Sequence, residues 1–543
     1  MISALAWIQK GVAKPKPLRY EMNESEYERI QSLVNDELEA AKQDAAEAKQ
    51  KAKTIAAAAP KAQTIEELEP ELAKYNLDDY DDTPEVQAGD GDDNGDDDID
   101  GLGAGNVSSL FSRMKDLTDQ VGDDEYLKPK DGDSDSEDDE YDILPTDNVL
   151  LAARTEENIS QLEMCVYEEQ ESNMYVHHDF MLPAFPLCVE PLDFDVRNPA
   201  NDAATANFVA IGTFDPFIEI WNLDLLDCMF PDVVLGQQTA DGKMRAKDRS
   251  VIKGSQRKEF HTDAIMGLSW NRSHRNLLAS SSADRTVKLW DLRTAQCAAS
   301  YDHHLDKVQA VEWNPAETTV LATGGYDRRV TVFDSRSPGS IMGTSLTGDV
   351  ECLRWDPHSP QCLYVTSDDG IVTYLDVRNL SSASVDAIQT LPQAPALYRI
   401  HAHDDAVSGF DVHPHVPGCI VTGSNDQKIK FWNIGSDLRP SMVLSRNLGV
   451  GKVFSLAFCP DSPFHLAAAG SEGKALVWNT YNNRSIRETF GPRFKGPTTP
   501  AVSANDNPVG VQHNADSDEE ENKDGLDQVG AGSFAMDEDE DSD

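Results

Sequence analysis

Three side chains near the middle of the chain have the residue types of a Ser-His-Asp catalytic set: His261, Ser280 and Asp284. In such a set the imidazole removes the hydroxyl proton while the carboxylate orients the ring. The same types also form structural networks, because a buried hydroxyl, imidazole or carboxylate needs a hydrogen-bond partner. The sequence around them, LLASSSADRTVKLWDLRT from Leu277 to Thr294, decides between these interpretations.

This stretch is one unit of an internal repeat. His261 and His304 are 43 residues apart, as are Asp284 and Asp327. Each Asp has a hydroxyl residue four positions earlier and an aromatic residue six positions later, and the same frame recurs once more. The three sets are His261, Ser280, Asp284, Trp290; His304, Thr323, Asp327, Phe333; and His403, Thr422, Asp426, Trp432. One active site does not repeat in this way, and no nucleophile elbow surrounds any copy, so we expect no catalysis by these residues.

The segments TVKLWDL, KIKFWNI and ALVWNT alternate with period two, which predicts short antiparallel strands. A repeat of this length with four strands and a Trp-Asp ending resembles the WD40 family, which forms β-propellers. The resemblance covers residues 147–490 and implies a buried His, Ser or Thr, Asp and Trp tetrad in each complete blade. Phe333 lacks the indole donor, so we expect the middle tetrad to be weaker.

The repeat count indicates the size of the propeller. Three further units keep the frame with fewer polar members, and the strand-like residues 147–183 supply a divergent first blade. The predicted fold is therefore all-β, a seven-bladed WD40 propeller, with eight blades as the alternative. Two insertions, at 224–258 and 379–399, interrupt the array; insertions of this length are typical of functional loops or disordered excursions.

The acidic residues divide the chain into three parts. Residues 1–146 contain 38 acidic against 15 basic residues, and residues 491–543 contain 14 against 3, within a net charge of -49. We expect both to be mostly disordered extensions around a folded domain at 147–490. Apolar residues spaced three and four apart predict a helix over 23–53. Three serines stand directly before acids and are phosphorylation candidates: Ser134, Ser136 and Ser517.

No other pattern indicates an enzyme. The pairs and triplets at 177–178, 401–403 and 413–415 contain His without Cys or carboxylates at metal-ligand spacing. Phosphate-binding and dinucleotide-binding glycine motifs are absent from the sequence. The eight Cys form no Cys-x-x-Cys pair, which is typical of reduced thiols inside cells. We predict no enzyme activity, no metal, no cofactor and no small-molecule substrate.

The sequence also has no run of about 18 apolar residues and no signal-peptide pattern in its first 15 residues. We therefore expect a soluble nuclear or cytosolic protein with no membrane partner. Its acidity argues against non-specific binding of nucleic acid by the whole chain, because phosphate contacts need Lys and Arg.

Surface recognition is the function that remains. In a propeller the loops that carry the repeat Asp lie on one face, and the residue before each Asp projects toward it. Exposed aromatic and cationic side chains there are interface anchors by type. The candidate partner-binding rim consists of Phe214, Tyr326, Arg285, Arg328, Arg329 and Lys452.

Four features together resemble the periodic tryptophan protein 1 family: an acidic extension with YNLDDYDD, the strand-like Tyr175–Asp195, the blade FVAIGTFDPFIEIWNLD, and the insertion before HTDAIMGLSWN. The resemblance implies a non-enzymatic nucleolar scaffold in large-ribosomal-subunit assembly and ribosomal RNA processing. The implied partners are pre-ribosomal assembly factors, ribosomal proteins and pre-ribosomal RNA.

Two alternative functions remain open. Histone association is also attributed to this family, and the acidic flanks motivate a histone or chromatin adaptor. In addition, Trp290–Arg293 resembles the Trp-Asp-x-Arg box of cullin ubiquitin-ligase substrate receptors, and the segments at 333–336 and 375–378 echo it.

Overall fold

The structure is a computed structural model that describes residues 1–20, 142–198, 205–236, 259–337, 339–383, 391–495 and 506–511. The chain divides into two compact units, Met1–Lys14 with Ile143–Asp224 and Met229–Asp543, and Pro15–Asp142 with Leu225–Cys228. Within the second unit, β2 (Leu18–Arg19) and β9 (Leu225–Leu226) pair in parallel. The predicted helix over 23–53 and most of both acidic extensions lie outside the described residues.

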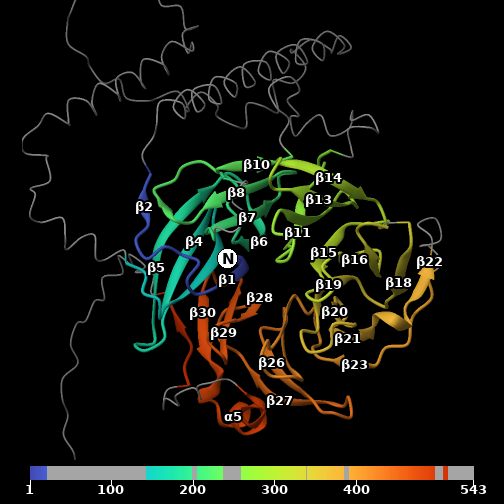
Figure 1. Ribbon diagram of the computed structural model, residues 1–543. Helices are drawn as coiled ribbons and strands as arrows, with labels where there is room; N and C mark the ends of the chain where they lie inside the picture. The colour runs from blue at the N-terminus through green and yellow to red at the C-terminus, as the bar shows by residue number, and fades with distance from the viewer. Residues whose placement is uncertain are drawn as a thin grey trace, which may run out of the picture. The chain divides into compact units, whose positions relative to one another are not determined.

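Seven antiparallel sheets surround a common centre in the first unit, which is the seven-bladed propeller predicted from the sequence (Figure 1). Blades 1 to 3, each from its innermost strand outward, are β1 (Ile2–Ile8), β3 (Asn148–Glu156), β4 (Ile159–Glu168), β5 (Asn173–Leu182); β6 (Pro186–Leu192), β7 (Phe208–Thr213), β8 (Ile218–Asn222), β10 (Val233–Leu235); and β11 (Ile265–Trp270), β12 (Leu277–Ser282), β13 (Val287–Asp291), β14 (Gln296–Tyr301).

Blades 4 to 7 follow the same order. They are β15 (Val308–Trp313), β16 (Val320–Gly325), β17 (Arg329–Asp334), β18 (Ile341–Ser345), β22 (Ser381–Ala383); β19 (Val350–Trp355), β20 (Cys362–Ser367), β21 (Ile371–Asp376), β23 (Tyr398–His401); β24 (Gly409–Val412), β25 (Cys419–Gly423), β26 (Ile429–Ile434), β27 (Pro440–Arg446); and β28 (Val453–Phe458), β29 (His465–Gly470), β30 (Ala475–Asn479), β31 (Val509–Gly510). The short helices described are η6 (Val377–Asn379), η8 (Thr480–Asn482), α5 (Arg484–Phe490) and η9 (Gly491–Arg493).

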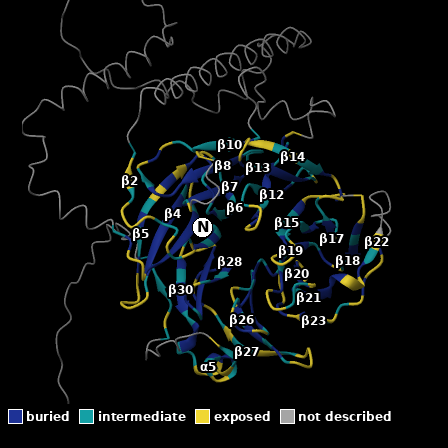
Figure 2. Ribbon diagram, viewed as in Figure 1, coloured by how far each residue is buried: buried dark blue, intermediate teal, exposed yellow. Residues whose placement is uncertain are grey.

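The apolar core lies between neighbouring blades. Phe431 of β26 packs edge-on against Phe458 of β28 and Trp478 of β30, for example. A strand in the middle of a blade has another blade on each face, so both of its faces are apolar; every residue of β7 and β29 is buried. Figure 2 shows the result, with buried strands and exposed turns.

The innermost strand of blade 1 comes from the first residues of the chain. β1 pairs antiparallel with β3, more than a hundred residues later. It is fixed to both neighbouring blades, because the Trp7 indole donates to the Ala457 carbonyl at 3.0 Å and the Ser3 hydroxyl donates to the Pro186 carbonyl at 2.6 Å. Residues 147–183 therefore supply only three strands of the first blade.

These strand assignments correct the predicted domain boundaries at 147 and 490. β1 lies before the first boundary, and β31 lies after the second. These strands have no local mark in the sequence, because β1 pairs with residues far along the chain and β31 contains only two residues. The insertion at 379–399 also has a structural role: its β22 adds a fifth strand to blade 4. Most of the insertion at 224–258 lies outside the described residues.

Candidate interaction surface

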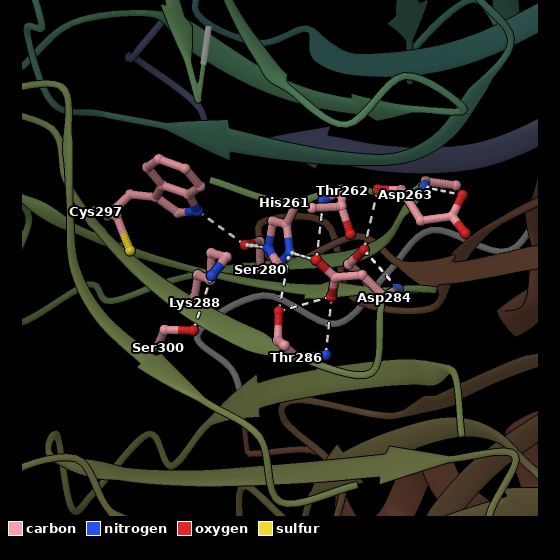
Figure 3. Close-up of polar contacts among 12 residues, drawn as sticks. His261, Thr262, Asp263, Ser280, Asp284, Thr286, Lys288, Cys297 and Ser300 are labelled. Carbon is pink, nitrogen blue, oxygen red and sulfur yellow. Dashed lines mark hydrogen bonds and ion pairs between the residues drawn. The ribbon is translucent and has the colours of Figure 1, made fainter. Parts of the chain in front are cut away.

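The polar network of blade 3 joins the three residues that resemble a catalytic set (Figure 3). Nε2 of His261 lies 2.7 Å from the Ser280 hydroxyl, and its Nδ1 lies 3.0 Å from Asp284 Oδ2. The Trp290 indole donates to the Ser280 hydroxyl at 2.8 Å. A chain of donors from indole to hydroxyl to imidazole to carboxylate therefore satisfies every member.

Electrostatics fit a neutral imidazole in this network. Burial lowers the pKa of His261, although Asp284 opposes this effect. Burial alone would raise the pKa of Asp284, but hydrogen bonds from His261, Thr286 and Thr262 hold it well below its usual range. The carboxylate also accepts from the backbone N–H of Thr286 at 2.9 Å, so it ties the turn between β12 and β13 to the loop before β11.

The Ser280 side chain cannot serve as a surface nucleophile in this arrangement. The residue is 0% exposed, and its hydroxyl already contacts both His261 and Trp290. A substrate carbonyl would have to enter the blade to reach Oγ. The geometry therefore favours a structural network over a catalytic one.

Blades 6 and 4 contain the other two sets. His403 lies 2.9 Å from Asp426 and 2.8 Å from Thr422, and the Trp432 indole donates to Thr422 at 3.1 Å. In blade 4, His304 lies 3.1 Å from Asp327 and 2.9 Å from Thr323. Here Phe333 cannot donate, and the hydroxyl of Thr331 lies 2.7 Å from that of Thr323 instead. Thr331 thus supplies a hydrogen-bond partner in place of the missing indole, which the prediction of a weaker middle tetrad did not consider.

The position four residues after the repeat Asp is a functional position that sequence reasoning missed. In blade 3 it holds Lys288, a fully buried cation that donates to the Ser300 hydroxyl at 2.8 Å. In blade 2 it holds Glu219, which accepts from the Trp221 indole at 3.0 Å and has a pKa raised by burial to about 7. The fixed offset was a usable signal, because Thr331 occupies the same position.

The predicted rim residues lie on or beside the hairpin turns of blades 2, 3 and 4, except for Lys452, which lies in the loop before β28. A non-glycine residue after the repeat Asp adopts positive φ in three blades: 71° at Arg285, 60° at Arg328 and 66° at Gln427. A non-glycine residue in this conformation is uncommon and costs about 1–2 kcal/mol. The tetrad beside each turn supplies the hydrogen bonds that hold the backbone in place.

The six rim candidates differ in their surroundings. Phe214 is 54% exposed and contacts the Phe185 ring, and Arg285 and Lys452 are also exposed. Arg328 forms an ion pair with Asp349 at 3.0 Å, and Arg329 forms one with Asp327 at 3.7 Å. Both arginines of blade 4 therefore lie beside an acid, the Arg328 side chain is still 62% exposed, and the binding role of this rim stays a prediction.

The surroundings of Tyr326, the remaining candidate, are acidic. The side chain is half-buried, and burial together with Glu351, Asp349 and Asp368 raises its pKa to about 12. Burial also raises the pKa of Glu351, to about 7. An anionic partner is disfavoured at this junction of blades 4 and 5, whereas a basic one is attracted.

Contacts between the innermost strands of three pairs of neighbouring blades were also missed. Backbone N–H groups of Trp270, Trp355 and Phe458 donate to carboxylates on the preceding blade, with N···O distances of 3.2, 2.8 and 2.7 Å. The acceptors are Glu190, Glu312 and Asp411. Glu312 and Asp411 each stand one residue before the end of their innermost strand, so the repeat frame contains a signal for these two acceptors.

The remaining predictions concern phosphorylation, metal binding, membrane spans and the cysteines. Ser134, Ser136 and Ser517 lie outside the described residues. Within the described part, no group of three His, Cys, Asp or Glu side chains is placed to hold a metal ion. Nor does any helix among those residues have the length and apolar character needed to cross a membrane. All eight Cys are free thiols.

The seven blades and the buried tetrads define a WD-repeat propeller. The model of the WD domain, G-beta repeat, matches residues 254–291, 295–334, 395–433 and 442–479. An uncharacterised WD repeat-containing protein of Schizosaccharomyces pombe is 44% identical, over 92% of each chain. Periodic tryptophan protein 1 of Saccharomyces cerevisiae is 32% identical over 90% of each chain, and its Drosophila melanogaster homologue is 27% identical over 90% of this chain and 96% of its own. The chain belongs to the periodic tryptophan protein 1 family.

Proposed function

We propose that this protein is a non-enzymatic nucleolar scaffold for assembly of the large ribosomal subunit and processing of its RNA. Family membership and the resemblance described above support this role. The structural observation that supports the scaffold part is that the polar groups of a tetrad are used inside the blade, while the side chain on the adjoining turn is exposed. In blade 3, His261, Ser280 and Asp284 are hydrogen-bonded to one another, whereas Arg285 is exposed on the turn that they hold. Phe214 is exposed on the corresponding turn of blade 2.

The proposal is tested by depletion and rescue. Depletion of the protein is expected to accumulate precursors of large-subunit RNA, and the full chain restores processing. Phe214→Ala is expected to restore it poorly, because an exposed aromatic anchor is removed. Met442→Ala is the matched control, since Met442 is 55% exposed on the outer strand of blade 6. Unchanged precursors after depletion contradict the ribosomal role, and full rescue by Phe214→Ala contradicts the assignment of the rim.

A second candidate, substrate recruitment to a cullin ubiquitin ligase, is favoured by two exposed arginines. The Arg336 and Arg378 side chains are 73% and 69% exposed, and each makes a two-point contact with the Asp two residues earlier. Bidentate pairing fixes the guanidinium plane for a partner surface. We expect the ligase adaptor to co-purify with the wild-type chain and not with Arg336→Ala/Arg378→Ala; no co-purification with wild type removes this candidate.

A further inference from the structure

The outer edge of blade 7 has a site for a carboxylate. Asp506 accepts a hydrogen bond from the Trp478 indole at 2.9 Å and one from the Asn483 amide at 3.2 Å. The Arg446 guanidinium lies 3.1 Å from the same carboxylate and donates to the Asp506 carbonyl at 2.9 Å. Three side chains from blade 7 and the preceding blade thus converge on one residue of the C-terminal segment.

This site replaces the network of the other blades. In blades 3 and 6 the indole donates to a Ser or Thr hydroxyl on the neighbouring strand. Blade 7 has Ala468 at the corresponding position. Ala468 pairs with Leu476, which stands two residues before Trp478. Trp478 is 0% exposed, so its buried indole N–H needs a hydrogen-bond acceptor. Because Ala468 has no hydroxyl, the acceptor must come from another residue. Asp506 supplies it.

The receiving side of the site is built independently of the segment that fills it. Trp478 belongs to the core cluster between blades 6 and 7, where its ring meets Phe431. The Arg446 guanidinium is stacked over the Trp478 ring at 4.9 Å, and its side chain is 26% exposed. Stacking on an aromatic face orients a guanidinium toward a carboxylate.

The segment itself makes few contacts. Of residues 506–511, none is buried, although Val509 and Val511 pack against the edge of the core cluster of blades 1 and 7. Only two residue pairs join β31 to β30, Leu476 with Gly510 and Val477 with Val509. By contrast, β1 buries Ile2, Leu5, Trp7 and Ile8. Local opening costs least where few apolar groups are buried, so residues 506–511 are expected to leave the edge more readily than any strand of the core.

We propose that the outer edge of blade 7 is a binding groove for an extended segment of a partner protein that carries one carboxylate, and that residues 506–511 occupy it within the chain until the partner displaces them. The partner contributes a carboxylate for Arg446, Trp478 and Asn483, followed by a short strand that pairs with β30. Strand addition to a sheet edge takes affinity from backbone hydrogen bonds and specificity from side-chain sites such as this one.

The test uses the full chain and a fluorescent peptide with the sequence of residues 504–513. Wild-type protein, whose groove is filled, is expected to bind this probe at least tenfold more weakly than the Asp506→Asn variant, whose own segment is weakened. A probe with Asn in place of its Asp is expected to bind that variant at least tenfold more weakly. Arg446→Gln in the same background is expected to abolish binding, whereas Arg439→Gln, an exposed arginine on the same outer strand region, leaves it unchanged.

Three outcomes overturn the proposal: equal affinity of wild type and Asp506→Asn, equal affinity of the two probes, or a concentration-dependent dimer of Asp506→Asn that assigns the groove to a second copy. If the Asp506→Asn variant fails to fold, hydrogen exchange on the unmodified protein still tests the proposal. Amides of β31 are expected to exchange at least a hundredfold faster than those of β1, and equal protection overturns the proposal. None of these measurements depends on the ribosomal role.

Discussion

At the scale of single residues, the repeat Asp does more than complete a tetrad. Asp284 accepts hydrogen bonds from two side chains, His261 and Thr286, and from the backbone of Thr262 and Thr286. It therefore connects the loop before the innermost strand to the turn that presents Arg285. Its removal leaves several buried donors without a partner, and an unpaired buried donor costs more than a hydrogen bond contributes.

Asp284→Ala is expected to lower the free energy of unfolding by about 2–4 kcal/mol at neutral pH, measured by denaturant titration. Asp404→Ala, on an exposed residue, is the control. Because the folded pKa of Asp284 is depressed, its contribution is present above an unfolded pKa of about 3.9 and disappears as pH falls below it. The variant should consequently lose less stability on acidification than wild type; identical acid sensitivity would contradict this account.

The pKa of Glu219 is shifted in the opposite direction to that of Asp284, so its effect on stability has the opposite dependence on pH. Its folded pKa of about 7 lies above an unfolded value of about 4.3, so the stability it allows is complete below about pH 4 and is lost as pH rises toward 7. Glu219→Gln keeps an oxygen acceptor for the Trp221 indole and removes the charge. We expect the variant to be more stable than wild type by about 1–3 kcal/mol at pH 8 and equal to it near pH 4.

Thermal unfolding across this pH range measures the difference. Glu317→Gln, at an exposed position, should leave the profile of the wild-type protein unchanged. A Glu219→Gln variant that is destabilised at pH 8 would show that the ionised form is the one that blade 2 requires.

At the scale of elements, β1 determines whether the ring closes. Its Trp7 is buried against blade 7 and donates to the Ala457 carbonyl, while its backbone pairs with β3. The N-terminal strand is therefore a component of the core, although the sequence that follows it is acidic and rich in small residues.

Trp7→Ala is expected to destabilise the propeller by about 3–5 kcal/mol, the usual cost of truncating a large buried aromatic residue. Trp7→Phe keeps most of the apolar contact and removes the indole hydrogen bond, so we expect a loss of about 0.5–1.5 kcal/mol. Denaturation monitored by tryptophan fluorescence and by circular dichroism provides the comparison. Equal stability of Trp7→Ala and wild type would mean that β1 is dispensable for closure.

At the scale of the whole molecule, the blades are joined into a ring by contacts between innermost strands. Arg354 of β19 lies 3.8 Å from Glu312 of β15 and 3.8 Å from Asp411 of β24, so one cation joins three consecutive blades. Desolvation raises the pKa of both carboxyl groups, and Arg354 opposes that rise. The two acids in turn accept backbone hydrogen bonds from the next blade.

Arg354→Met is expected to cost about 1–3 kcal/mol, because two carboxylates facing the centre lose their counter-charge. Without the cation their pKa values rise further, so the deficit should grow between pH 5 and pH 8. Arg336→Met, which removes an exposed ion pair, should change the stability little at any pH in this range. A pH-independent deficit in Arg354→Met would indicate that packing, rather than charge, explains the loss.

The sequence by itself determined the repeat, the strands and the members of the tetrads, because each of these depends on residues at fixed offsets within one repeat unit. Ser280 lies in β12 and Asp284 in the turn that follows it, and alternation with period two is visible without any partner. The number of blades followed by counting units. Lys288 and Glu219 also stand at one fixed offset, four residues after the repeat Asp of their blades.

Only the tertiary structure decided how the ring closes and which charges are free. β1 and β31 reach the propeller from outside the repeat array, through strand partners that are distant in sequence and have no local mark. Whether Arg328 is a free cation depends on Asp349, which comes from the loop before the next blade. The role of Asp506 likewise depends on Arg446 and Trp478, which contact it only in the folded chain. Packing brings together groups that no spacing along the chain relates, and for that reason the closing strands and the rim charges required the folded chain.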